Sequence, residues 1–176
     1  MCARKAVALA EELAAGDLTN DVRSQIGTSA APPVPDFAFE QDGAQNTLSQ
    51  TLKSGPVLLV LFAAQPPRTR LEQLASAGPR FAAAHLRVIA AGLGRSAVKA
   101  PFNVEISDDA RAALSLFRLR SDGGETELML DRGANVRARW TANGAGGLAD
   151  PGTLLSDAVR VASIPVAAAN HAGHGQ

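Results

Sequence analysis

The segment Val57–Phe62 limits the folds open to this chain more than any other part of its sequence. All six of its residues (VLLVLF) are apolar, Gly55-Pro56 precede them and Pro66-Pro67 follow a few residues later. A continuous apolar run of this length between such residues is typical of a central β-strand that is covered on both faces. The sequence therefore predicts a layered α/β domain built around this strand.

Helical and extended patterns alternate along the rest of the chain. The right-handed rule for βαβ crossovers predicts that the strands over 57–62 and 86–90 are parallel, and the turn at 132–135 predicts an antiparallel hairpin. We therefore expect a mixed central sheet with helices on both faces. The other expected elements are a strand over 37–39, a helical turn over 48–52, a helix over about 69–84 that Gly78-Pro79 kinks or divides in two, an extended piece over 102–106, a helix over 108–117, strands over 126–130 and 136–140, and a helix from 151 to about 163.

The composition of the chain changes near its two ends. Residues 1–27 are rich in helix formers and predict an N-terminal helical segment. Residues 28–35 (TSAAPPVP) have the proline and small-residue content of a linker. We therefore expect one α/β domain over 36–165, followed by a disordered tail over 166–176.

The charge balance and the aromatic content exclude one class of partner. Lysine and arginine together number 17, as do aspartate and glutamate, so the formal net charge is zero. Nucleic-acid-binding surfaces normally show a clustered basic excess or a set of stacking aromatic rings, but this chain has no tyrosine and one tryptophan. We expect no nucleic-acid partner. Trp140 is expected to pack against the sheet.

The sequence also limits where the protein acts. No apolar run reaches about 18 residues, so we expect no membrane span within the chain. Arg4 and Lys5 precede a stretch that Glu11 and Glu12 interrupt, which does not fit a signal peptide. The protein is therefore expected to be cytoplasmic if the chain is complete, or else a soluble part of a larger membrane-associated protein.

Cys2 is the only cysteine, so no intramolecular disulfide can form and no cysteine cluster can hold a metal. A working thiol normally needs surroundings that lower its pKa, and the sequence around Cys2 does not indicate such a site. An inert terminal residue is the favoured interpretation, and an intermolecular bridge is the alternative.

A set of short local sequences, taken in order, resembles the thioredoxin-like superfamily, and specifically its redoxin branch of thiol-specific antioxidant and envelope thiol-disulfide proteins. The similarity covers about residues 31–164. It is carried by Pro35-Asp36-Phe37, Asp42-Gly43, Leu48-Ser49, the run from Gly55 to Phe62, the strand from Leu86 to Ala90, Ser107-Asp108, Leu116-Phe117, and the hairpin from Leu128 to Trp140. The resemblance implies a thioredoxin-like fold with an N-terminal helical extension.

The resemblance also implies where the catalytic groups of this family would lie. Active members place a Cys-x-x-Cys or a peroxidatic cysteine after the strand that ends here at Phe62, at the start of the next helix. The matching positions lie within 66–70 and hold no cysteine. A cis-proline is expected near Glu125, within 121–125, and no proline is present there. The resemblance thus implies a degenerate, redox-inactive copy with no cofactor, and argues against an enzyme.

The leading hypothesis is a protein- or peptide-binding module that keeps the groove of the family. The candidate groove residues are Gln65, Pro66, Pro67, Arg68, Thr69, Gly124 and Glu125. Arg68, Thr69 and Arg70 at the helix start have two interpretations, a solvated first turn or a site for an anion or a peptide carboxylate.

Two alternatives remain open at the sequence level. His171 and His174 in the tail are candidate ligands for weakly held copper or nickel, although accidental tail composition is the favoured interpretation. Cys2 is the candidate for a residual thiol-dependent antioxidant activity. The resemblance also favours a bacterial, periplasmic or envelope-facing location.

Overall fold

A seven-stranded mixed sheet forms the centre of the molecule. The computed structural model describes residues 33–41, 43–63, 65–94, 99–118, 125–144 and 146–165. The sheet order is β2-β1-β5-β4-β3-β6-β7. The strands are β1 (Ala38–Gln41), β2 (Ala44–Thr47), β3 (Val57–Phe62), β4 (Arg87–Gly92), β5 (Asn103–Ile106), β6 (Thr126–Leu130) and β7 (Val136–Thr141).

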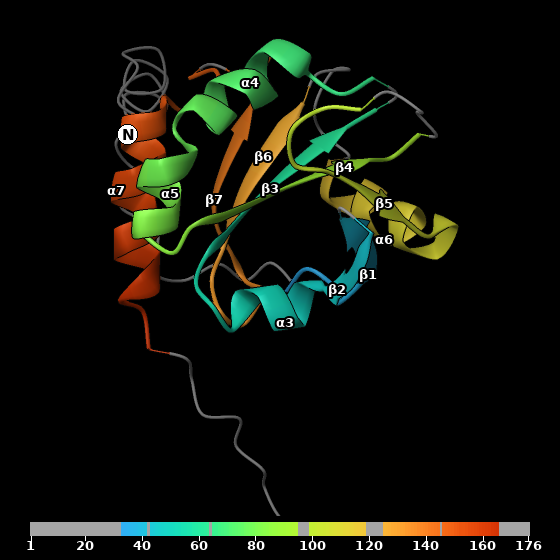
Figure 1. Cartoon of the computed structure of the whole chain (residues 1–176), viewed down its shortest axis with the longest axis horizontal. Coiled ribbons are helices and arrows are strands. Elements are labelled where there is room, and N and C mark those ends of the chain that lie inside the picture. Colours follow the sequence, from blue (N-terminus) through green and yellow to red (C-terminus); the bar gives the residue numbers. More distant parts are fainter. Residues whose placement is uncertain are drawn as a thin grey trace, which may run out of the picture.

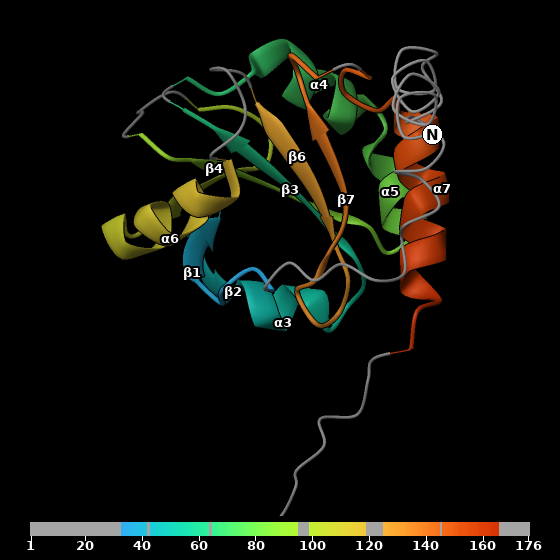
Figure 2. The same ribbon diagram turned by 180° about the vertical axis from the view of Figure 1, so that it is seen from behind.

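Helices cover both faces of this sheet, as the sequence predicted (Figures 1 and 2). One face carries α3 (Leu48–Leu52) and α6 (Asp108–Arg118), and the other carries α4 (Arg68–Ser76), α5 (Gly78–Ala83) and α7 (Pro151–Ala162). β3 is buried along its whole length. Its alternate side chains enter two separate cores, because successive residues of a strand point to opposite faces. The continuous apolar pattern of β3 is thereby explained.

The predicted parallel crossover is confirmed, since β3 pairs in parallel with β4, and β4 in turn pairs in parallel with β5. The hairpin is confirmed as well, because β6 pairs antiparallel with both β3 and β7. Trp140 on β7 packs against the core under α4, α5 and α7, as expected.

The expected helix over 69–84 is divided in two, which was one of the two predicted outcomes. The division falls at Ala77, the C-cap of α4 and N-cap of α5, and Pro79 lies in the first turn of α5 where its missing N–H costs nothing. Two other features differ from the sequence prediction. β4 extends to Gly92, beyond the expected end at Ala90, because it pairs with β3 as far as Phe62. β2 was not predicted, and it is a polar strand that pairs with β1 alone.

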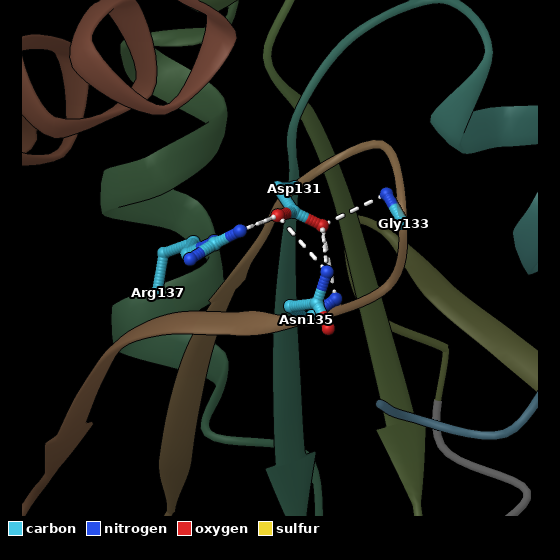
Figure 3. A network of polar contacts seen from close by, with 4 residues as sticks. All are labelled: Asp131, Gly133, Asn135 and Arg137. Carbon is cyan, nitrogen blue, oxygen red and sulfur yellow. Dashed lines mark hydrogen bonds and ion pairs between the residues drawn. The ribbon is translucent and has the colours of Figure 1, made fainter. Parts of the chain in front are cut away.

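The turn between β6 and β7 is organised by one carboxylate (Figure 3). Asp131 accepts hydrogen bonds from the backbone N–H groups of Gly133 and Asn135, from the Asn135 amide and from the Arg137 guanidinium. Arg137 lies at the irregularity in the β6–β7 register, which frees it to reach back to the turn. Burial raises the pKa of Asp131, but the Asn135, Arg137 and Gly133 hydrogen bonds outweigh it and leave the pKa lowered.

The N-terminal boundary of the packed domain is also visible. Val34, within the expected linker, is buried and donates a backbone hydrogen bond to the carbonyl of Ala134 in the hairpin turn. Asp36 accepts hydrogen bonds from the backbone and hydroxyl of Ser49 at the start of α3. The predicted helical segment 1–27 and tail 166–176 lie outside the described residues. Among the described residues, no helix is both long and apolar enough to cross a bilayer.

Candidate functional site

The candidate site is the corner at which β3 ends and α4 begins. Here Gln65, Arg68 and Thr69 are exposed and Pro66 is buried. Pro67 is the N-cap of α4 and offers no side-chain acceptor to the first backbone N–H groups of the helix. Those groups therefore have no capping hydroxyl or carboxylate from the N-cap residue.

Two further segments meet this corner. The backbone N–H groups of Leu93 and Gly94 donate to the carbonyls of Phe62 and Ala63, which fixes the chain after β4 against the corner. In the β3–β6 register Leu61 faces Thr126, so Glu125, one residue earlier, lies at the same edge of the sheet. The structure thus brings the residues 65–69 close to Glu125. Gly124, the remaining groove candidate, lies outside the described residues.

A buried ion pair lies beneath the corner. Arg70, in the first turn of α4, donates from Nε and Nη2 to the two carboxylate oxygens of Glu127, at 2.7 and 2.8 Å. The exposed fraction is 8% for Arg70 and zero for Glu127. Arg70 also donates to the side chain of Gln73 and to the backbone carbonyl of Ala149, just before α7. One guanidinium therefore joins α4, the middle of the sheet and the entry to α7.

This geometry corrects one interpretation of Arg70. The sequence placed it at a solvated helix start or in an anion site, but its guanidinium is turned inward and is occupied by Glu127. Arg68 is left as the exposed cation of the corner, with Glu72 at 3.4 Å on the helix surface. Glu127 was missed by sequence reasoning. Its signal was a single acidic residue beside the apolar run Leu128–Leu130, together with an arginine at a buried position of α4.

Glu125 has an altered environment at the rim of the corner. Burial raises the pKa of its carboxyl, the charge of Glu127 raises it further, and Arg70 lowers it in part. A carboxyl with a raised pKa holds its proton to a higher pH than usual.

The corner has side chains that can bind a ligand through hydrogen bonds and charge. Gln65 has an amide, Thr69 a hydroxyl, Arg68 a cation and Glu125 a carboxyl, and the first turn of α4 beside them has no side-chain N-cap. A group of this kind hydrogen-bonds an extended backbone or a terminal carboxylate. No thiol lies among the described residues, since the single cysteine of the chain is Cys2.

The metal hypothesis concerns residues that the structure does not describe. His171, His174 and Cys2 all lie outside the described residues. Within the described part of the chain, no three histidine, cysteine or acidic side chains come together in a group that suits a metal ion.

No protein-family model and no curated protein sequence matches this chain. Solved structures do match it. The chain is similar to BsSco, a member of the Sco family of cytochrome c oxidase assembly proteins, with a TM-score of 0.56 at 14% identity over 80% of this chain and 99% of that one. It is also similar to the peroxidoxin BcpB from Mycobacterium tuberculosis, with a TM-score of 0.54 at 18% identity over 76% and 97% of the two chains.

A thiol:disulfide interchange protein from Bacteroides sp. matches with a TM-score of 0.54 at 13% identity, over 83% of this chain and 95% of that one. The mixed sheet and its helices therefore have the arrangement that the sequence resemblance implied, and the predicted fold is confirmed.

Proposed function

We propose that this chain, which has the thioredoxin-like fold of the redoxins, is a redox-inactive module that binds an extended protein or peptide segment at the β3–α4 corner. The observation that carries the proposal is the composition of the corner. Residues 66–70, the positions at which the resemblance implies a thiol or thiol pair, hold no cysteine, while Arg70 and Glu127 join the corner to the sheet from below.

A corner that is rigid and has no nucleophile is suited to binding a ligand rather than to catalysis. Arg70 is held by Glu127, Gln73 and Ala149, so the first turn of α4 has little freedom to move relative to the sheet. A preformed site binds its ligand with a smaller ordering cost than a flexible one. The exposed Arg68 and Thr69 then favour a segment that presents backbone carbonyls or a terminal carboxylate.

Two measurements test the two halves of the proposal. For redox inactivity, the purified protein is assayed for insulin reduction with dithiothreitol and for peroxide consumption, beside a Cys2→Ser variant. We expect both proteins to match the background rate. Turnover well above background in either assay contradicts redox inactivity, and its loss in Cys2→Ser would assign it to that thiol.

For binding, peptides from a random display library are selected on the immobilised domain and then mapped by amide chemical shifts in NMR spectra. We expect the selected peptides to shift the amides of residues 65, 68 and 69 together with Glu125. Leu116 on α6, which is exposed on the other face of the sheet, provides the control amide. Peptides that shift α6 and leave the corner unchanged would contradict the proposed location.

The bacterial envelope remains a prediction from the resemblance. Metal binding by His171 and His174 and thiol chemistry at Cys2 remain predictions from those residue types. Copper or nickel titration of the full chain and of a chain that ends at residue 165 tests the metal hypothesis, which predicts that only the full chain binds.

A further inference from the structure

A cavity of about 300 Å³ lies at the edge of the sheet opposite the corner, where α5 leads into β4. β3 and β4 lie side by side and are parallel (Figure 1). The corner follows the end of β3, whereas the lining of the cavity includes the first residues of β4. The two places are therefore separated by about the length of a six-residue strand, on the order of 15–20 Å. The cavity is separate from the proposed peptide site.

The walls of the cavity are apolar and its rim is polar. The described lining residues are Gln41, Ser54, Gly78, Phe81, Ala82, His85, Leu86, Arg87, Val88 and Phe102. Phe81, Leu86 and Val88 are buried and belong to the core under α5, and Phe102 packs against the same core. A concave, mostly apolar space of this volume with a few polar groups is the usual form of a small-molecule site.

The backbone beside the cavity takes the left-handed conformation at two residues. His85, with a φ of 55°, follows Ala84, the C-cap of α5, and this conformation is a common way to end a helix. Phe102 has a φ of 60°, in a region that bulky side chains avoid, and strain of this kind gathers at ligand sites. Among the described residues outside glycine, Ala134 in the hairpin turn is the third with a positive φ.

The wall formed by the α5–β4 turn is also fixed in place. Gly55, with a φ of 156°, packs so closely that a Cβ atom on it would overlap the carbonyl oxygen of His85. The backbone N–H of Arg87 donates to the carbonyl of Pro56 at 3.1 Å. The shape of the cavity is therefore set before any ligand arrives, which reduces the cost of binding.

The charged and polar residues that line the cavity favour an anionic ligand. Arg87 supplies a cation and His85 an imidazole, and none of the described lining residues is acidic. Ser54 and Gln41 add neutral hydrogen-bonding groups at the rim. We propose that this cavity binds a small organic anion that carries one apolar ring, with the ring between Phe81 and Phe102 and the anionic group toward Arg87.

The test uses three probes that share a ring and differ in charge: phenylacetate, benzyl alcohol and benzylamine. Each is titrated into the full chain, and the amide shifts of Leu86, Val88 and Phe102 are followed by NMR. We expect phenylacetate to saturate with a dissociation constant of about 0.1–1 mM, which suits a ligand of this size. Benzyl alcohol should bind at least about fivefold more weakly, and benzylamine should not saturate.

Matched variants separate the two parts of the site. Arg87→Gln should weaken phenylacetate at least about fivefold and leave benzyl alcohol unchanged, whereas Arg80→Gln, on the exposed side of α5, should change neither. Ala82→Phe places a ring into the cavity and should abolish binding of both probes. Ala83→Phe adds the same ring to the neighbouring exposed position of α5, which does not line the cavity, and is the control for helix stability.

Several results would overturn the proposal. They are the absence of saturable shifts with phenylacetate in a folded protein, equal affinity for benzylamine, and phenylacetate binding that survives Ala82→Phe. None of these outcomes affects the peptide site at the corner, because no variant here touches residues 65–70 or Glu125.

Discussion

Arg70 and Glu127 show how two residues determine the character of the corner. A buried ion pair contributes little net stability on its own, since both charges lose their hydration, but removal of one partner leaves an uncompensated charge. Here the pair is bidentate and the remaining Arg70 donors reach Gln73 and the carbonyl of Ala149. The pair therefore acts mainly to specify how α4 sits on the sheet.

Replacement of Glu127 by glutamine tests this role. The variant leaves the Arg70 guanidinium buried without its counter-charge, so we expect a loss of about 3–5 kcal/mol in the free energy of unfolding, measured by urea denaturation. The double variant Arg70→Met/Glu127→Leu should recover only part of the loss, because the carbonyl of Ala149 then lacks its donor. A single variant within about 0.5 kcal/mol of the parent, inside the range of an ordinary surface change, would contradict the role.

Glu125 gives a residue-scale prediction that depends on pH. Burial and the charge of Glu127 raise its pKa in the folded protein, so the folded state binds the proton more tightly than the unfolded state does. The ionised carboxyl therefore destabilises the fold above its folded pKa, and this penalty disappears below the unfolded pKa.

Glu125→Gln should consequently stabilise the protein at neutral pH, by less than about 1 kcal/mol because the group is part-exposed and water screens it. The gain should vanish as the pH falls through about 4, near the unfolded value of a glutamate. Urea denaturation of the parent and the variant at pH 7 and pH 3.5 measures the difference. A gain that is as large at the lower pH would assign the effect to packing instead.

At the scale of elements, some helices and strands follow from the local sequence pattern, whereas others form only through pairing with a neighbouring strand. β3, the β6–β7 hairpin and α7 follow from local features: a continuous apolar run, a turn sequence, and Asp150-Pro151 at a helix start. β2 (AQNT) has no strand-forming composition of its own, and exists because its backbone pairs with β1 from Ala38 to Gln41. A pattern within one segment cannot reveal such a strand.

The β6–β7 hairpin depends on the network of Asp131 (Figure 3). The lowered pKa of Asp131 means that its carboxylate stabilises the fold above the unfolded pKa, and that this contribution is lost as the pH falls through the folded pKa. Asp131→Asn should therefore cost about 1–3 kcal/mol at pH 7, because the amide is a weaker acceptor for Arg137 and the turn.

The difference in the free energy of unfolding between the parent and Asp131→Asn should shrink in acid, where the carboxylate of the parent is protonated. Denaturation curves at pH 7 and pH 2.5 measure this convergence, and Asp109→Asn, at an exposed aspartate of α6, is the control. A constant difference across the two pH values would show that the charge of Asp131 does not support the hairpin.

At the scale of the whole molecule, the sequence predicted which segments form the corner but not what lies below it. The position of residues 65–69 follows from the order of β3 and α4, and Glu125 joins them through the β3–β6 register. The ion pair cannot be predicted from local sequence patterns, because Arg70 and Glu127 are 57 positions apart and meet only when the sheet is complete. The cavity beside α5 was missed for the same reason, since Gln41 in β1 and Phe102, just before β5, are distant from α5 along the chain.

If the folded chain keeps the corner of the family, thiols placed there should behave as a redox pair. In Pro66→Cys/Thr69→Cys, made with Cys2→Ser, the two cysteines stand on either side of the start of α4 with Cys-x-x-Cys spacing, and Arg70 is unchanged. The free N–H groups and dipole of the helix stabilise a thiolate. We expect oxidation to remove both titratable thiols and two mass units, as a disulfide requires, and the reduced protein to give slow insulin reduction that Pro66→Cys/Cys2→Ser lacks. Two thiols that stay free under oxidant would mean that the distance or direction across Pro67 and Arg68 differs from that of a working dithiol, and would argue that the corner has diverged in shape as well as in chemistry.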